Sequence, residues 1–286
     1  MGCCSTPPWP RRRIRSSWPR PCARASRRGA RPTWPGACRC AASPPRARRW
    51  RAPSGRAVSE RVSDHPHRPI RSFVRREGRL TAGQQRALDD LYPRYGIDWP
   101  GGPIDVATRF ERSAPLVLDI GFGDGEALAE MAAAHPGRNY LGVEVYRTGT
   151  GRLLRRIESE GLDNLRVLLA DASELLRDGL ASESLAGVQL FFPDPWTKKR
   201  HHKRRIVQSE WLARVADRLQ PGGFLHMATD WADYAEWMRT LAEAEPRLEN
   251  LHGGYAPDAG DRPETRFERR GLRKGHAVFD LVLRRI

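Results

Sequence analysis

The chain has 286 residues and a formal net charge of +16 at pH 7. That length accommodates one large domain or two small ones, and the charge by itself favours a protein that binds nucleic acid. No apolar run approaches the roughly 20 residues that a membrane-spanning helix needs, so we expect no membrane partner.

The positive charge is concentrated at the beginning of the chain. Residues 1–57 contain fifteen Arg and no Asp, Glu or Lys. The remaining 35 basic residues are balanced by 34 acidic ones, so the rest of the chain is nearly neutral. Any nucleic-acid site in that part must therefore come from locally clustered charge.

The first 57 residues also contain ten Pro and show no apolar periodicity, so they cannot bury enough surface to form a core. We predict that residues 1–67 form a disordered Arg/Pro-rich extension and that residues 68–286 form one domain. Three interpretations of the extension stay open: a basic tail that adds RNA affinity, a targeting peptide, and translated sequence upstream of the true start codon. All five cysteines lie in the extension, without metal-ligand spacing: Cys3, Cys4, Cys22, Cys38 and Cys40. We therefore expect a cytoplasmic protein with no metal.

From residue 81 onwards, the pattern alternates between helices and strands. A helix over 81–91 is predicted by a Thr81 cap with Gln84 three residues later. Further helices are predicted around 128–132, over 151–160, from 173, around 211–219 and over 234–244, and strands over 116–120, 140–145, 165–169, 188–192, 224–228 and 276–283. Such alternation predicts an α/β fold with a mostly parallel sheet and helices on both faces.

The first strand ends in a glycine-rich turn, residues 119–125. Gly121 and Gly123 let a backbone approach a ligand closely. A dinucleotide site favours a third glycine, but Glu126 stands there and would repel a pyrophosphate. Asp119, two residues before the first glycine, indicates a ligand with a positive group, such as a methionine-type ammonium or sulfonium.

Two more acids follow the next two strands. Glu144 closes the second strand, where an acid accepts from ribose hydroxyls of NAD or S-adenosylmethionine. Asp171 follows the third strand and could accept from an adenine amino group. Each acid alone could be a helix cap or a solvated loop residue. Together with the glycine turn they predict S-adenosylmethionine as the cofactor.

The fourth strand leads into an aromatic, carboxylate and proline segment, residues 191–196, which would form a stiff lip over a methyl donor. A run with six Lys or Arg and two His follows, residues 198–205. Such a run can be a solvated face. Beside a methyl-donor pocket, the interpretation that it steers RNA phosphates is favoured.

These segments together resemble the bacterial tRNA (guanine-N7-)-methyltransferase family. The matching residues are 71–76, 121–123, 142–145, 191–196, 203–205, 228–231 and 265–268, and the resemblance spans about 68–286. The family resemblance implies a Rossmann-like class I methyltransferase with a seven-stranded sheet and an antiparallel last strand. It also implies methyl transfer from S-adenosylmethionine to a guanine in the tRNA variable loop. The chain departs from the family in its extension and in Asp119, where Glu is frequent.

The resemblance also implies roles for particular residues. Asp119, Glu144, Asp171 and Asp194 would contact the cofactor beside Gly121 and Gly123, with Asp194 as the candidate catalytic residue. The substrate nucleotide would be bound by Lys198, Asp230, Thr265, Arg266, Phe267 and Glu268. The RNA would be contacted by Arg200, His201, His202, Lys203, Arg204 and Arg205.

Three other functions stay open at this point. An NAD(P)-dependent oxidoreductase would share the alternation and Glu144, but Glu126 counts against it. A non-catalytic RNA-binding module would explain the basic run but not the acids around the glycine turn. A methyltransferase acting on another RNA site or on a small molecule is the strongest rival, because residues 193–196 are similar to the D-P-P-[YW] segment of amino-methylating enzymes. The oligomeric state is left open.

Overall fold

The computed structural model of the protein describes residues 71–73 and 78–286, so the predicted extension over 1–67 lies outside the described residues. The strands are β1 (Gly96–Ile97), β2 (Leu116–Ile120), β3 (Asn139–Glu144), β4 (Leu165–Leu169), β5 (Leu185–Phe191), β6 (Leu219–Thr229), β7 (Leu248–Asn250) and β8 (Phe279–Arg285). The helices are α1 (Ala82–Tyr95), α2 (Glu126–Ala134), α3 (Arg147–Glu160), α4 (Ala172–Glu174), α5 (Ser209–Arg218), α6 (Ala232–Glu243) and α7 (Arg266–Leu272), with short turns η1 (Ala107–Arg109), η2 (Leu175–Gly179) and η3 (Lys199–Arg204).

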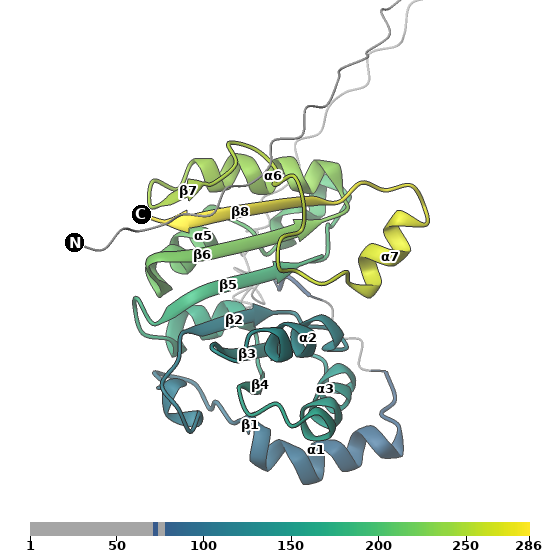
Figure 1. The fold of residues 1–286 in the computed structure, drawn as a ribbon. Coiled ribbons are helices and arrows are strands. Elements are labelled where there is room, and N and C mark those ends of the chain that lie inside the picture. Colours follow the sequence, from purple (N-terminus) through teal and green to yellow (C-terminus); the bar gives the residue numbers. More distant parts are fainter. Residues whose placement is uncertain (1–70, 74–77) are drawn as a thin grey trace, which may run out of the picture. The chain divides into compact units, whose positions relative to one another are not determined.

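The described strands form one sheet in the order β1-β4-β3-β2-β5-β6-β8-β7 (Figure 1). The pairs from β1 to β6 are all parallel, and β8 is antiparallel to both of its neighbours. The predicted mostly parallel α/β sheet with an antiparallel last strand is confirmed. The sequence pattern predicts six of these strands and the family resemblance implies seven. The described sheet has eight, because the short strands β1 and β7 add to the six.

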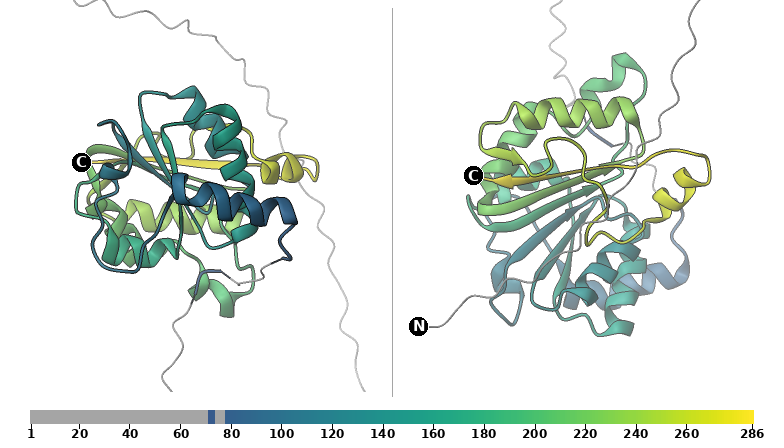
Figure 2. Two further views of the ribbon diagram at one scale, coloured as in Figure 1. Left: turned by 90° about the horizontal axis from the view of Figure 1, so that it is seen from below. Right: turned by 45° about the horizontal axis from the view of Figure 1, so that its top comes forward.

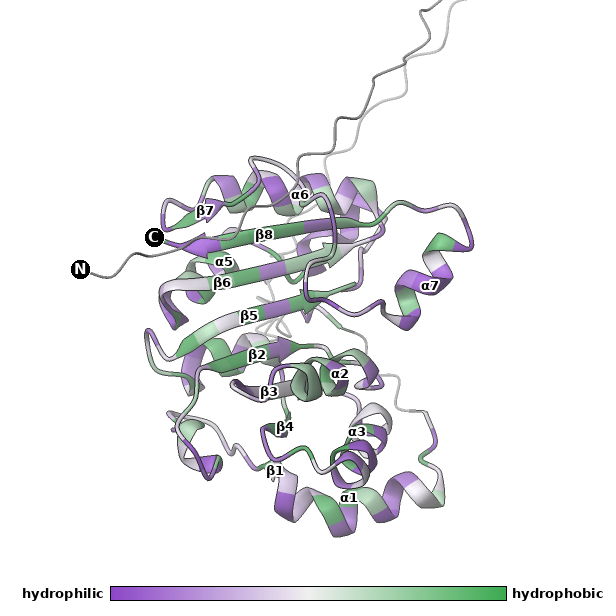
Figure 3. Cartoon of the chain, in the orientation of Figure 1, coloured by the Kyte–Doolittle hydropathy of each residue, from purple (hydrophilic) through white to green (hydrophobic). Residues whose placement is uncertain are grey.

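Helices cover both faces of the sheet (Figure 2). Buried residues of α1, α2 and α3 pack with Val117, Tyr140 and Val167 on one face. Those of η2, α5 and α6 pack with Leu118 and Leu141 on the other. Neighbouring residues of one strand point to opposite faces, so the same strand supplies both cores. The strands are accordingly apolar along much of their length (Figure 3).

Three elements begin three to five residues earlier than predicted: α3 at Arg147 rather than 151, β5 at Leu185 rather than 188, and β6 at Leu219 rather than 224. Two further boundaries differ at α1 and β8. The capping box of Thr81 and Gln84 is present at the start of α1, but the helix continues through Pro93 to Tyr95, whose ring is buried. The last strand begins at Phe279 rather than at His276, because the imidazole of His276 turns towards Asp230 at 3.1 Å.

The chain reverses its direction across the sheet between β2 and β5. From β2 it proceeds to β3 and β4 on one side, and from β5 to β6 on the other. Ligands in sheets of this kind bind at the carboxyl ends of the strands beside such a switch point. The fold therefore places the candidate site at the ends of β2, β3 and β5.

Candidate active site

A cavity of about 310 Å³ lies at this switch point. It is lined by the ends of β2, β3 and β5, by the residues that follow β4, by the first turn of α7 and by residues 72–73. Figure 1 shows α7 on the side of the sheet towards which the parallel strands point. The predicted cofactor residues all line this cavity: Asp119, Gly121, Gly123, Glu144, Asp171 and Asp194.

The glycine turn depends on backbone conformations that other residues rarely adopt. Gly121 and Gly123 have φ values of +76° and +62°, in the left-handed region where a side chain causes strain. Gly149 of α3 lies so close to the turn that a Cβ there would be 1.7 Å from the carbonyl oxygen of Gly123. Close packing of α3 thus fixes the turn at the edge of the cavity.

Asp119 lies at the base of the cavity and is 4% exposed. Burial raises the pKa of this carboxyl group from 3.8 to about 7, and the nearby Glu144 adds to the increase. No ion pair of Asp119 with a basic side chain is found among the described residues. A buried acid with a raised pKa that faces a cavity is a candidate functional-site residue.

Glu144 is held by the backbone around it. Its Oε2 accepts from the N–H of Gly123 at 3.0 Å, and its Oε1 accepts from Val145 at 2.7 Å and Tyr146 at 3.3 Å. Burial still raises the pKa of Glu144, because it outweighs these hydrogen bonds. Since a carboxylate oxygen has two lone pairs, Oε2 keeps one acceptor position for a ligand hydroxyl.

Asp171 caps a helix and also lies at the cavity. Its Oδ1 accepts from the N–H of Ser173 at 2.9 Å and so caps α4. The same residue lines the cavity. The cap fixes the carboxylate in place, and its second oxygen has no hydrogen-bond partner among the described residues.

Asp194 extends from the lip that follows β5. Phe192 and Trp196 on either side have φ values of +51° and +44°, which are unusual for such residues and show that the surroundings hold the lip in a fixed shape. Partial burial raises the pKa of Asp194, and the positive charge of Arg204 acts in the opposite direction. Asp194 thus lies on the lip and lines the cavity.

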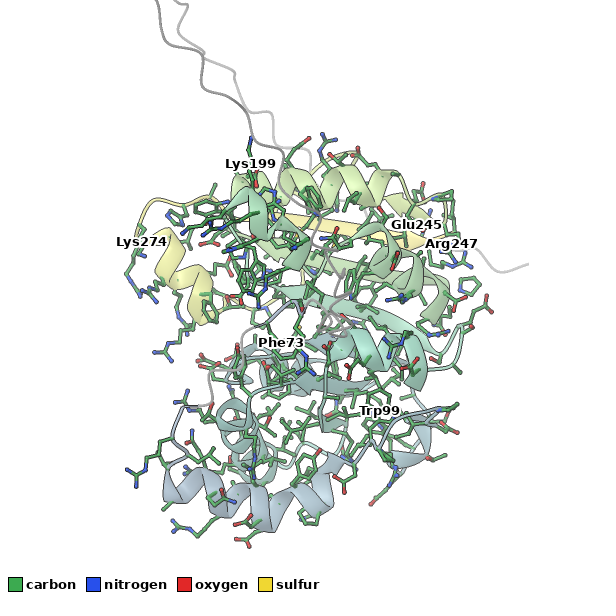
Figure 4. All side chains as sticks on the ribbon, turned by 180° about the vertical axis from the view of Figure 1, so that it is seen from behind. Phe73, Trp99, Lys199, Glu245, Arg247 and Lys274 are labelled. Carbon is green, nitrogen blue, oxygen red and sulfur yellow. The ribbon has the colours of Figure 1, made fainter. Side chains whose placement is uncertain are left out.

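Residues 71–73 lie against this lip. The indole N–H of Trp196 donates to the carbonyl oxygen of Ser72 at 2.9 Å. Arg204 donates to the carbonyl oxygens of Arg71 and Phe73, both at 3.1 Å, and its guanidinium lies 3.8 Å from the centre of the Trp196 ring. These contacts bring Phe73 into the cavity wall, and it is seen close to the middle of the domain in Figure 4.

The basic run forms the turn η3 beside the lip, and its members differ in exposure. Lys198, Lys199, Arg200 and Lys203 are exposed, and Lys199 points away from the domain in Figure 4. Their exposure is compatible with the predicted role of the run in binding RNA, which stays a prediction.

The two predicted histidine contacts are half-buried. His201 packs edge-on against Trp196, with ring centres 5.9 Å apart, and His202 packs against Trp237 at 6.0 Å. Burial and the neighbouring Arg200 lower the pKa of His201.

The prediction that Arg205 contacts RNA is wrong, because this residue is only 2% exposed. Its Nε donates to the carbonyl oxygen of Pro195 at 3.0 Å, and it forms an ion pair with Asp233. Its guanidinium lies against the rings of Tyr234 and Trp237, 4.8 and 5.3 Å from their centres. Arg205 therefore supports the lip from inside and does not face RNA.

Of the predicted substrate residues over 265–268, some are buried and others are exposed. Thr265 caps α7 and forms a capping box with Glu268, which is 8% exposed. The side chains of Arg266 and Phe267 remain exposed and line the cavity. The T-x-x-E spacing that predicts such a capping box was present in the sequence, but no helix was predicted there.

Arg262 binds Glu268 from within the domain, and no sequence motif pointed to this residue. Its side chain is fully buried and donates to both carboxylate oxygens of Glu268 and to both of Asp280, the latter at 2.8 and 2.9 Å. Burial lowers the pKa of Arg262, but the two carboxylates more than compensate and the net shift is upward.

The same arginine connects α7 to the lip. Its guanidinium lies 5.6 Å from the ring centre of Phe191 and 5.4 Å from that of Phe192. His226 packs edge-on against Phe191 at 5.0 Å and hydrogen-bonds to Asp280 at 2.8 Å. We call Arg262, Glu268, Asp280 and His226 the buried clamp. It joins β6, β8, α7 and the start of the lip.

Asp230, a further predicted substrate residue, lies after β6. Its carboxylate contacts the imidazole of His276 at 3.1 Å. It also lies next to α7, because a Cβ on Gly271 would be 2.9 Å from its Oδ2. Asp230 is half-buried but is not in the cavity wall.

Neither a membrane-spanning helix nor a metal-binding group is found in residues 71–73 and 78–286. No helix there combines the length and the apolar character that crossing a membrane requires. Nor does that part of the chain contain a group of three or more His, Cys, Asp or Glu side chains able to hold a metal ion.

Comparison with known proteins agrees with this site. A family model described as "Putative methyltransferase" matches residues 113–281. Together with the sheet order and the cavity at its switch point, this match defines the protein as a methyltransferase with a class I α/β fold.

Related proteins show to which family of methyltransferases the chain belongs. The tRNA (guanine-N(7)-)-methyltransferase of Alkalilimnicola ehrlichii is 62% identical over 222 residues, which cover 76% of this chain and 93% of that relative. The enzyme of the same name from Halorhodospira halophila is 62% identical over 220 residues, 76% of this chain and 95% of that relative. That from Bordetella pertussis is 48% identical over 241 residues, covering 82% and 95%. The chain belongs to the bacterial tRNA (guanine-N(7)-)-methyltransferase family.

Proposed function

We propose that the protein transfers the methyl group of S-adenosylmethionine to N7 of a guanine in the variable loop of tRNA. The observation that carries the proposal is the buried carboxylate of Asp119 in a cavity at the switch point, beside an exposed cationic run. Family membership supports the same reaction. A cytoplasmic location is part of the proposal, since the substrate is tRNA.

The residues around the cavity fit such a donor. Asp119 has no cationic partner among the described residues and suits an ammonium group. Glu144 keeps an acceptor position for a ribose hydroxyl, and Asp171 has a free carboxylate oxygen for an adenine amino group. When bound, S-adenosylmethionine supplies an electrophilic methyl group.

Guanine N7 has an in-plane lone pair and carries no hydrogen, so its attack requires no base to remove a proton. The reaction instead moves positive charge onto the purine. We assign Asp194 the role of a fixed negative charge that stabilises this developing cation. The position of Asp194 in the cavity wall supports this role.

In vitro methylation of total tRNA tests the proposal directly. We expect methyl incorporation from S-adenosylmethionine, and borohydride–aniline cleavage at a single position in the variable loop. Incorporation at another base or atom would favour a methyltransferase with a different RNA site. No incorporation into tRNA would reject the proposal.

Asp194→Asn and Asp194→Ala are expected to lower the single-turnover rate about 10- to 100-fold, about 1.4–2.7 kcal/mol of activation free energy. The affinity for S-adenosylhomocysteine should fall much less, because Asp119, Glu144 and Asp171 remain. Asp178→Asn serves as a control, since that acid lies on the surface next to Arg177. Wild-type rates in the Asn variant would remove Asp194 from the mechanism.

Replacing Lys199, Arg200 and Lys203 together with alanine is expected to weaken tRNA binding and to reduce its dependence on salt. The slope of log affinity against log salt should decrease in magnitude by about 2–3, roughly one unit for each lost phosphate contact. Arg204 and Arg205 are left intact, because they hold residues 71–73 and the lip. The control replaces Arg94, Arg177 and Arg284 together with alanine, which changes the net charge by the same amount. Equal salt slopes in the two triple variants would indicate that the basic run is only a solvated surface.

A further inference from the structure

One aromatic side chain at the cavity is exposed without an evident structural reason. The exposed large hydrophobic residues in the described part are Trp231, Leu251, Phe267, Leu272 and Ile286. Phe267 is 61% exposed, and it is the member of this group that lines the cavity. An apolar ring kept in solvent at the entrance of a reaction site is a candidate contact surface for substrate.

The position of Phe267 is fixed from three sides. The capping box of Thr265 and Glu268 fixes the first turn of α7, which contains Phe267. The buried clamp attaches Glu268 to the sheet through Arg262. On the outer side, Arg269 pairs with Glu126 of α2 at 3.0 Å. Phe267 is therefore presented on a rigid element, as a recognition surface requires.

The buried clamp also determines which side chains of residues 265–268 can reach a nucleotide. Glu268 is buried, and its carboxylate accepts from Arg262 and from the N–H of Thr265 at 3.2 Å. Reading a guanine edge with Glu268 would require breaking these contacts. The side chains that α7 already presents to the cavity are those of Arg266 and Phe267.

We propose that the ring of Phe267 stacks on the target guanine and favours the cationic purine that the reaction produces. The proposal rests on the proposed function, because it specifies how that substrate is held. In the reaction, guanine N7 forms the N–CH₃ bond with its lone pair as the S–CH₃ bond breaks. No proton is transferred, a neutral thioether leaves, and the positive charge passes from sulfur to the purine.

The face of an aromatic ring attracts cations, so the attraction between Phe267 and the purine increases as N7 acquires the methyl group. An interaction that is stronger in the transition state than with the substrate increases the rate of the chemical step. Stacking on an aromatic side chain also keeps an unpaired base out of the RNA stack. Phe267 thus complements Asp194, which acts on the same charge through its carboxylate.

The test compares Phe267→Leu, which keeps an apolar contact but removes the ring, with Phe267→Trp, which keeps an aromatic face. Leu272→Ala is the matched control, because Leu272 is a similarly exposed residue of α7, 50% exposed, outside the cavity wall. Binding of GMP and of 7-methyl-GMP is measured in the presence of S-adenosylhomocysteine, at about pH 6, where 7-methylguanine is cationic. Single-turnover rates on tRNA are measured in parallel.

We expect wild type, Phe267→Trp and Leu272→Ala to prefer 7-methyl-GMP. In Phe267→Leu, that preference and the single-turnover rate should both fall about tenfold. An unchanged preference in Phe267→Leu would overturn the stacking proposal, even if the enzyme methylates tRNA normally. Conversely, wild type could fail to methylate tRNA and still show a preference that depends on Phe267. That result would support the stacking proposal and reject the proposed function.

Discussion

Arg262→Met is expected to lower the free energy of unfolding by about 3–5 kcal/mol. The substitution keeps most of the apolar volume but leaves Glu268 and Asp280 buried without their cation. Breaking a buried ion pair from one side is much more costly than removing the whole pair, because an uncompensated charge remains in the interior. Urea unfolding followed by circular dichroism measures the difference.

The surface of α6 provides a matched control. Arg239 also binds two carboxylates, Glu236 at 2.7 Å and Glu243 at 2.8 Å, but these acids are largely exposed. Arg239→Met should therefore change stability much less than Arg262→Met, because exposed ion pairs contribute little. Similar losses in the two variants would contradict the clamp.

Adding the neutral substitutions Glu268→Gln and Asp280→Asn to Arg262→Met should recover part of the lost stability, because no buried charge is then left unpaired. Methylation should not recover with it. The clamp connects α7 to Phe191 and Phe192, and neutral side chains do not restore that connection. Recovery of both stability and activity would show that the clamp does not position α7.

The sheet could be predicted because its signals are local. The apolar run 116–120 is bounded by Pro115 and Gly121 and coincides with β2, and the run 165–169 coincides with β4. The segment α7 was missed although Thr265 and Glu268 have capping-box spacing, because its seven residues have little apolar periodicity. Short elements such as β1 and β7 depend on pairing with distant strands, which periodicity does not reveal.

The grouping of the acids followed from topology. Parallel strands place their carboxyl ends at one edge of the sheet, so Asp119, Glu144 and Asp171 had to lie close together once the strands were assigned. Their individual roles remain predictions.

The burial of Arg205 could not be predicted in this way. In the sequence it is the last of six basic residues, and only the packing of α6 shows that Tyr234 and Trp237 enclose it. The same holds for Arg262, whose partners Glu268 and Asp280 are separated from it by 6 and 18 residues.

Asp119→Asn is expected to stabilise the ligand-free protein at alkaline pH. The pKa of Asp119 is raised to about 7 in the folded protein, against 3.8 for an unperturbed group. The stability that this shift contributes is complete below about pH 3.8. It falls as the pH rises from 3.8 to about 7, because the unfolded chain then releases the proton while the buried carboxyl retains it, and it is fully lost above about 7. Asparagine is neutral throughout, so the variant should gain at most about 4 kcal/mol at pH 8.5 and about 1.6 kcal/mol at pH 5.

Thermal unfolding between pH 5 and 8.5 measures this difference, at roughly 2–4 °C for each kcal/mol in a domain of this size. Asp124→Asn is the control, because Asp124 lies in the same turn but is only half-buried and pairs with Arg266 at 3.7 Å. Because Asp124→Asn keeps Asp119, its stability should follow the pH profile of wild type. A pH profile of Asp119→Asn that parallels wild type would exclude a buried, ionisable Asp119.

The same charge that destabilises the empty protein should bind the ligand. S-adenosylhomocysteine carries an ammonium group, and losing a hydrogen bond to a charged acceptor should weaken its binding about 10- to 100-fold in Asp119→Asn. Below about pH 7, the ligand must also displace a proton from Asp119 as it binds. The heat of binding in wild type should therefore depend on the ionisation enthalpy of the buffer, and this dependence should decrease in the Asn variant. Equal proton release by the two proteins would assign the ammonium group to another acid.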